Sequence, residues 1–252
     1  ASFPAIDFYT KQLTLDGKDT GSWKFELKTD SQGAYISDWF IQSDNLAVNN
    51  GSLAWLKTED ESSSRLSLNG SVKDISVAMR SFGIPPGLSS ESGIFSVELN
   101  TAGSPDQLGA ELTTGKVHLY AKNGRFLSGD ANGVFGVLNL FNFDGLMRRL
   151  TSDFAGLGGE SMRYRKIDGG FFLKDDVIWI EDAIKVDGVS ANFELSGLYY
   201  LKNDQLDMSL VVTLPVNKNL PWYGALVGGL PAAVAVFIAG KLFESSIKVL
   251  SS

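Results

Sequence analysis

Apolar and polar residues alternate along most of this chain, in short runs separated by Gly, Asn, Asp and Ser. A period of two is typical of β-strands that bury one face, because successive side chains of a strand point to opposite sides. The pattern therefore predicts a mainly antiparallel β fold. The clearest runs contain Leu13 and Leu15; Trp23, Phe25 and Leu27; Leu66 and Leu68; Phe95, Val97 and Leu99; Val117, Leu119 and Ala121; and Met208, Leu210, Val212 and Leu214.

Four dipeptides that tolerate positive φ lie between these runs or at their ends, and such pairs allow the chain to reverse in a tight hairpin. We expect a meander of hairpins that forms one continuous sheet, with a seam near Ser89 to Gly93. The four dipeptides are Asn69-Gly70, Asn123-Gly124, Asp168-Gly169 and Asp187-Gly188.

A short helix is predicted within residues 72–88. Apolar residues recur at helical spacing from Val72 to Phe82, and Pro85-Pro86 follows as a stop signal. A second helical region is expected within 132–158, where Leu146 and Leu150 are apolar and two arginines lie near the end, as a helix C-terminus favours.

A third segment, 220–244, has no charged residue between Lys218 and Lys241, which raises the question of a membrane span. Several glycines and Pro231 interrupt it, so a continuous span would need other protein groups to satisfy the freed backbone. We expect a helical hairpin packed on protein, with a true membrane span as the alternative.

The rest of the single domain, residues 1–71, 89–131 and 160–215, is predicted to be strands.

Composition narrows the function classes. The 252 residues are 44% hydrophobic, which can support a real core, and the net charge of −7 comes from acids spread along the chain. Nucleic acid is a poor partner, because binding phosphates needs a basic patch. Without cysteine, disulfides, thiolate metal sites and nucleophilic thiols are excluded. The first residues lack the features of a signal peptide, so targeting of an exported protein is expected to lie upstream.

Catalytic chemistry is not predicted. The single histidine, His118, lies by alternation on the polar side of a strand, and no orienting partner can be identified for it. The adjacent carboxylates Asp175-Asp176 and Glu181-Asp182 point to opposite faces of a strand and suit turns or strand edges. The acidic run 59–61 lacks the spacing of a calcium loop, and the glycine clusters lack a phosphate-binding fingerprint. We expect no enzyme, no metal site and no cofactor.

Aromatic residues are abundant in the predicted strands, and their wide apolar surfaces leave two alternatives. They can fill the core of an ordinary β-sandwich with a structural or adhesive role in binding proteins or glycans, which alternation alone favours. They can instead line an open apolar surface, because the chain offers many apolar strand faces and few helices to cover them.

An ordered series of motifs from about Lys73 onward decides between these alternatives. The chain resembles the C-terminal region of AsmA-like bacterial envelope proteins of the YhdP type, related to TamB and AsmA. The series consists of the 72–82 helix with Gly83-Ile84-Pro85-Pro86-Gly87, Ser92-Gly93-Ile94-Phe95, Gly103-Ser104-Pro105-Asp106, Lys122 to Leu127, Gly136 to Leu140, Leu146 to Leu150, Asp153-Phe154, Gly169 to Phe172, Val186-Asp187-Gly188, Glu194 to Gly197, Leu230 to Ala233 and Lys241-Leu242-Phe243.

The resemblance implies an elongated, twisted sheet bent into a U-shaped hydrophobic groove (β-taco-like), with a few short helices near the C-terminal end. The implied function is transfer of phospholipid, or another acyl-chain lipid, across the periplasm between inner and outer membranes, supporting outer-membrane integrity. It also implies that residues 1–252 are a C-terminal fragment of a longer protein, anchored in the inner membrane of a Gram-negative bacterium, touching membrane at its ends and open to envelope protein partners.

Site residues follow from these expectations. The apolar residues of the strand runs are predicted to line the groove, and residues of the two later helical regions are predicted to cap it or to contact membrane. The lining set is Trp23, Phe25, Leu27, Leu66, Leu68, Phe95, Val97, Leu99, Val117, Leu119, Phe193, Leu195, Met208, Leu210, Val212 and Leu214. The capping set is Leu146, Leu150, Trp222, Tyr223 and Phe237.

Overall fold

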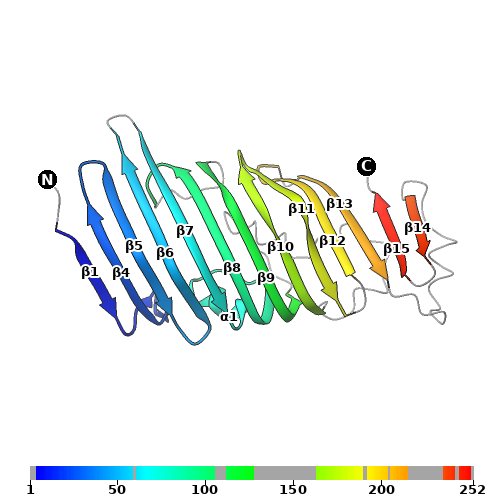
Figure 1. The fold of residues 1–252 in the computed structure, drawn as a ribbon, viewed down its shortest axis with the longest axis horizontal. Coiled ribbons are helices and arrows are strands. Elements are labelled where there is room, and N and C mark those ends of the chain that lie inside the picture. Colours follow the sequence, from blue (N-terminus) through cyan, green and yellow to red (C-terminus); the bar gives the residue numbers. More distant parts are fainter. Residues whose placement is uncertain are drawn as a thin grey trace.

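The fold is dominated by one long antiparallel sheet (Figure 1). A computed structural model describes residues 4–58, 61–105, 112–127, 163–189, 192–203, 205–214, 235–241 and 244–250. Its strands are β1 (Ile6–Thr10), β2 (Thr14–Leu15), β3 (Lys18–Asp19), β4 (Ser22–Thr29), β5 (Gly33–Gln42), β6 (Leu46–Lys57), β7 (Ser62–Val72), β8 (Leu88–Ala102), β9 (Thr113–Phe126), β10 (Arg163–Lys174), β11 (Val177–Gly188), β12 (Asn192–Tyr200), β13 (Gln205–Leu214), β14 (Ala235–Lys241) and β15 (Glu244–Leu250).

Thirteen strands make up the main sheet, in the order β1-β4-β5-β6-β7-β8-β9-β10-β11-β12-β13-β15-β14. Each strand from β5 to β12 therefore pairs with the strands before and after it in sequence. β4 pairs with β1 across the β2–β3 hairpin, and β13 pairs with β15 rather than with β14. The predicted meander is confirmed. The predicted seam is absent, because β8 runs through Ser89 to Gly93 and pairs along this stretch with β9.

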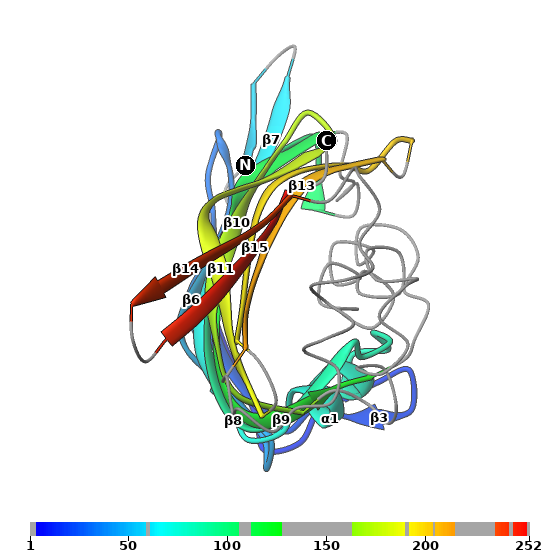
Figure 2. The ribbon, with the colours of Figure 1, turned by 90° about the vertical axis from the view of Figure 1, so that its right-hand side faces the viewer.

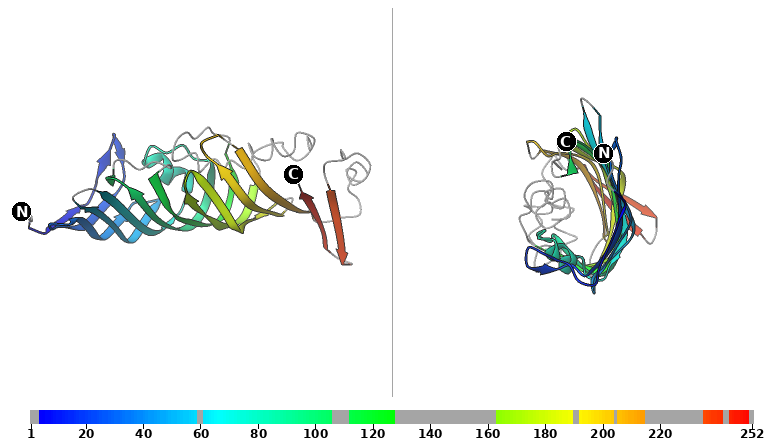
Figure 3. Two further views of the ribbon diagram at one scale, coloured as in Figure 1. Left: turned by 90° about the horizontal axis from the view of Figure 1, so that it is seen from above. Right: turned by 90° about the vertical axis from the view of Figure 1, so that its left-hand side faces the viewer.

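The main sheet is a single layer that is long, twisted and bent. Viewed along its length it forms an arc with a concave and a convex face (Figures 2 and 3). β2 and β3 form a separate two-stranded hairpin, which lies beside the helix α1 at one rim of the arc. No second sheet faces the main sheet among the described strands, so the described part of the chain is not a sandwich.

The short helix expected within 72–88 is present as α1, Ile75–Ser81. Asp74 caps its N-terminus, because the Asp74 side chain accepts a hydrogen bond from the backbone N–H of Ser76. Ile75 and Ala78 are buried, and α1 packs against β8. Val72, which the helical spacing had included, is instead the last residue of β7.

The helix predicted for 220–244 is wrong over its last part, where Ala235–Lys241 form β14. A short apolar run cannot be assigned to helix or strand by spacing alone, and the β-branched Val236 and Ile238 favour a strand. Residues 220–234 and the helical region predicted at 132–158 lie outside the described residues.

Three of the four predicted hairpin dipeptides lie inside strands: Asn69-Gly70 in β7, Asn123-Gly124 in β9 and Asp168-Gly169 in β10. Only Asp187-Gly188 ends a strand. The glycines are needed because a neighbouring strand comes close. A Cβ on Gly70 would lie 2.4 Å from the carbonyl oxygen of Ala47, for example.

The tight β10–β11 turn is made instead by Asp175 and Asp176, whose φ angles of 53° and 59° match a type I′ turn. The prediction that Asp175 and Asp176 lie in a turn is confirmed.

Candidate functional site

One face of the main sheet is apolar across the strands β1 to β13 that carry described side chains. Residues directly opposite each other on neighbouring strands share a face, so the strand register traces that face from strand to strand. For example, Leu68 lies opposite Val97, which lies opposite Val117, and Val117 lies opposite Phe171. The same tracing continues to β1 through Leu27 opposite Ile6. We call this surface the apolar face.

Charged residues are almost excluded from the apolar face. Among its register pairs, the only charged side chain is Lys57, the terminal residue of β6, opposite Ser62. The other face carries the charges, often as opposite-sign cross-strand pairs such as Glu98 opposite Lys116. A sheet divided in this way presents one face that water solvates well and one that it does not.

The apolar face is the concave one. Helix α1 lies inside the arc of the sheet (Figure 2). The side chain of Ile75 lies 3.5 Å from the point that a Cβ atom on Gly93 would occupy. Gly93 lies opposite Val72 and Ala121, both on the apolar face. The concave surface of the arc is therefore formed by apolar side chains.

The register brings the predicted lining residues together on this face. Fourteen of the sixteen have described side chains, and all fourteen belong to the apolar face; their role as lining stays a prediction. The backbone positions of Val212 and Leu214 lie opposite Phe193 and Ser245. Of the predicted capping set, Phe237 lies in β14, opposite Lys248, and Leu146, Leu150, Trp222 and Tyr223 lie outside the described residues.

Sequence alternation missed part of the apolar face because bulges shift its period. In β5, Asp38 adopts a φ of 49°, and the register shifts between Ile36 and Trp39, so both lie on the apolar face despite their odd spacing. A similar irregularity separates Ile180 from Ile184 in β11. The missed members include Ile36, Trp39, Ile41, Leu53, Trp55, Ile167, Phe171, Ile178, Ile180, Ile184 and Val186.

The apolar face differs in burial between two sections. In the N-terminal section, β4–β8, its central side chains are half-buried, and Trp55 is 37% exposed. In the C-terminal section, β10–β13, the described side chains are mostly buried, and Leu195 is 2% exposed. An open apolar surface therefore exists mainly in the N-terminal section.

The β2–β3 hairpin is tied to the rim of the N-terminal section through one hydroxyl group. The buried Thr20 hydroxyl donates a hydrogen bond of 2.8 Å to the carbonyl oxygen of Leu13 and accepts one of 3.0 Å from the indole N–H of Trp23. The Trp23 ring lies 5.6 Å from that of Trp39. The hairpin thereby fixes one end of the apolar face.

A buried tyrosine joins β8 to β10 at the same rim. The Tyr164 hydroxyl donates a 2.6 Å hydrogen bond to the carbonyl oxygen of Ser89, and the ring packs against Phe126. Burial, with a smaller contribution from the charge of Asp74, raises the pKa of Tyr164 well above its ordinary value near 10.

The convex face carries exposed charge pairs. A hydrogen bond from Lys28 lowers the pKa of Glu26, and the same contact raises the pKa of Lys28. His118 lies on the polar face, as its alternation predicted, and 3.4 Å from the carboxylate of Asp168 on the neighbouring strand. These pairs are solvated, and such pairs contribute little to stability.

The described residues contain no group of three or more His, Cys, Asp or Glu side chains able to hold a metal ion. Within the same residues, no helix has the length and apolar character needed to cross a bilayer.

The fold and this surface together define a class: a single-layer β protein with a continuous, concave apolar face. The chain belongs to the YhdP family, because the model of that family, described as "YhdP protein", matches residues 1–252.

Among curated proteins, the chain is similar to the "Intermembrane phospholipid transporter YhdP" of Escherichia coli (strain K12), with 26% identity over 221 residues. The match covers 83% of this chain but only 17% of that relative. No solved structure matches the chain.

Proposed function

We propose that this chain is a section of an intermembrane lipid transporter that shields acyl chains along its concave apolar face. The main support for this proposal is the apolar face itself. It is a surface of apolar side chains, almost free of charged groups, that crosses consecutive strands of a single-layer sheet. Family membership supports the proposal, as does the name of the E. coli relative.

The physical basis is the cost of exposing lipid tails. Each methylene group moved into water costs about 0.8 kcal/mol, so a phospholipid with two long chains does not cross an aqueous space unaided. A U-shaped apolar groove removes most of this cost, and the polar headgroup stays in water at the open side. No catalytic group is needed.

The half-buried N-terminal section is the best candidate for contact with cargo. Its central side chains, such as Leu66, Leu68 and Val97, are accessible yet surrounded by apolar neighbours. In the proposal the protein acts in the periplasm of a Gram-negative bacterium, within a longer chain anchored in the inner membrane. Phospholipid is its cargo, and membranes or envelope proteins meet its ends.

Site-specific photocrosslinking tests the proposal with controls on the same strands. A crosslinking amino acid at Leu68 or Val97 should give lipid adducts identifiable by mass spectrometry. The same group at Ser67 or Ser96, one residue away and on the convex face, should give few. Lipid adducts at both faces in equal yield, or at neither face, would contradict an apolar groove.

A further inference from the structure

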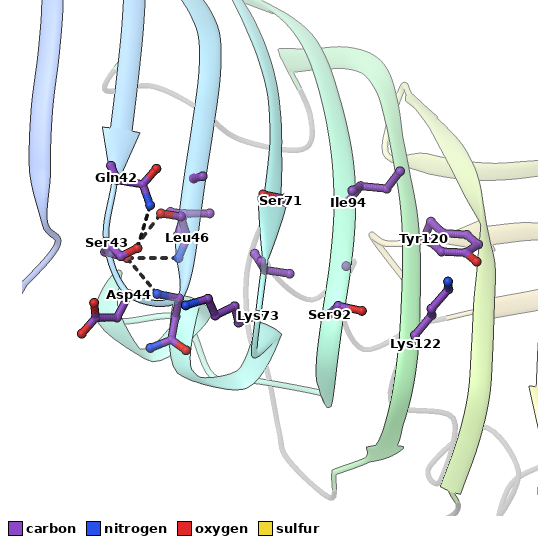
Figure 4. A pocket seen from close by; sticks show the side chains of 14 residues that line it. Gln42, Ser43, Asp44, Leu46, Ser71, Lys73, Ser92, Ile94, Tyr120 and Lys122 are labelled. Atoms are coloured by element: carbon purple, nitrogen blue, oxygen red, sulfur yellow. Dashed lines mark hydrogen bonds between the residues drawn. The ribbon is translucent and has the colours of Figure 1, made fainter.

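A hollow of about 460 Å³ lies on the convex face, away from the proposed lipid surface (Figure 4). It opens close to the rim, where the turn after β5 and the residue after β7 contribute to its lining. Its floor includes three small side chains of neighbouring strands, Ala47, Ser71 and Ser92. Its size lies within the usual range of small-ligand sites.

A row of cations crosses the strands at this level. Lys122 lies opposite Ser92 on one side and opposite Lys166 on the other. Lys73 follows Val72, the residue opposite Gly93, so it stands level with Ser92 at the end of β7. Along the backbone Lys73 and Lys122 therefore lie on either side of Ser92, although the Lys73 side chain extends toward the turn after β5, away from Ser92 (Figure 4).

The internal stability of the sheet explains the row only in part, because Lys166 has partners in Asp187 opposite it, Asp168 beside it and the Tyr120 ring 5.1 Å from its ammonium group. Like charges directly opposite each other on neighbouring strands are destabilising, and Lys122 opposite Lys166 is followed by Arg125 opposite Arg163. Such clustering is unexpected in a chain with a net charge of −7. A site for an anion gives these residues a role.

Local partners neutralise only part of the positive charge. Lys166 lies 3.0 Å from Asp168, whereas Lys73 and Lys122 make no ion pair with another described residue. The ammonium of Lys122 lies 5.5 Å from the ring of Tyr120, a weak attraction. The one carboxylate that lines the hollow, Asp44, lies at the same end as Lys73, whereas Lys122 lies at the other end (Figure 4).

We propose that this hollow binds the phosphate group of a phosphate ester over Ser71 and Ser92, with Lys122 at one end of the hollow and the flexible Lys73 side chain at the other. The hydroxyls of Ser71 and Ser92 line the hollow, so both can donate to phosphate oxygens. Ile94, which is 58% exposed beside them, suits the carbon part of the ester.

The phosphate has two sources with the same chemistry, a lipid headgroup or a soluble phosphate ester. The site does not depend on the proposed function, because it lies on the convex face and uses none of the residues of the lipid test. A failure of either proposal therefore leaves the other standing.

Titration of the 252-residue chain with glycerol phosphate, followed by ³¹P NMR and by amide shifts, tests the site. The double variant Lys73→Gln, Lys122→Gln should weaken binding about tenfold or more, because it removes both charged donors. The matched control, Lys116→Gln with Lys174→Gln, removes the same charge from exposed positions outside the hollow and should change binding less than about twofold.

Inorganic phosphate and vesicles separate the two sources. Phosphatidylcholine vesicles that bind only when they contain phosphatidic acid would indicate a lipid headgroup, whereas binding of glycerol phosphate or inorganic phosphate alone would indicate a soluble source. Both results support the site if the Lys73/Lys122 variant abolishes them. Equal weakening by the two double variants, or no saturable binding of any phosphate probe at millimolar concentration, would overturn it.

Discussion

The N-terminal and C-terminal sections of the sheet have the same alternation of apolar and polar residues but differ in how the apolar face is used. In β4–β8 the central side chains of this face are half-buried, as at Leu66 and Leu99. In β10–β13 the equivalent residues, such as Ile178 and Leu195, are buried. Alternation reports which residues share a face, whereas exposure depends on tertiary packing that a period of two does not encode.

The difference in burial between the two sections also decides which residues are the most informative to substitute. The lining predicted from the sequence includes Leu210 and Val212, both in the C-terminal section. Leu210 is only 7% exposed, so a charge there would disturb packing first. Leu66 and Leu68, in the half-buried section, are better positions for separating lipid binding from folding.

The largest expected effect on stability comes from placing an aspartate on the apolar face, once in the C-terminal section and once in the N-terminal section. Leu195→Asp buries a carboxylate without a partner and should cost about 3–5 kcal/mol, with loss of amide protection in β11–β13 measured by hydrogen exchange. Leu66→Asp should cost only about 1–2 kcal/mol but abolish lipid crosslinking at Leu68. Leu195→Met is the volume-conserving control and should cost less than about 1.5 kcal/mol. Equal destabilisation by the two aspartates would show that both sections are closed cores.

Removal of the Tyr164 hydroxyl is expected to have the next largest effect. Tyr164→Phe leaves the Ser89 carbonyl oxygen without its 2.6 Å hydrogen bond, at a cost of about 1–2 kcal/mol at neutral pH. Thermal unfolding and exchange of the β8 and β10 amides would measure it. An unchanged melting temperature would show that water replaces the hydroxyl at this rim.

The same tyrosine makes stability depend on alkaline pH. Its pKa is raised in the folded state, so above about pH 10 the unfolded chain loses a proton that the folded chain keeps. Stability should be insensitive to this group below that pH and should fall by about 1.4 kcal/mol per pH unit above it. Urea unfolding from pH 9 to 11 should show a steeper decline for the wild type than for Tyr164→Phe, and parallel curves would contradict the assignment.

A smaller effect is expected at the β2–β3 hairpin. Thr20→Val keeps the shape of the side chain but leaves the Leu13 carbonyl and the Trp23 indole N–H without their shared partner, at a cost of about 1 kcal/mol. Faster hydrogen exchange should be confined to the hairpin and the start of β4. Thr20→Ser, which keeps the hydroxyl, is the control.

The smallest effect is expected on the convex face. Glu26→Gln removes an exposed ion pair with Lys28, and such pairs contribute little in water, so neither the melting temperature nor lipid crosslinking should change measurably. A clear loss of crosslinking would mean that the convex face takes part in lipid contact, against the division between the two faces.

The sequence predicted the strands and their common apolar face well, because these follow from local alternation. It missed the members displaced by bulges, such as Trp39 after Asp38, since a bulge breaks the period without a strong sequence signal. It also assigned Asn69-Gly70 to a turn, although Gly70 lies in β7 where the carbonyl of Ala47 leaves no room for a Cβ. Close approach of neighbouring strands is a tertiary property and is not encoded in the dipeptide.

The order in which the strands pair has a consequence for how the molecule loses structure. From β5 to β12, each strand of the main sheet pairs only with the strands before and after it in the chain. In such quasi-one-dimensional architectures the free energy of unfolding is approximately a sum of terms for each unit and for each pair of neighbours. Loss of one strand therefore removes directly only the contacts of that strand with its two neighbours. Partial melting from one end, with the remainder still paired, is therefore the natural response of this protein to stress.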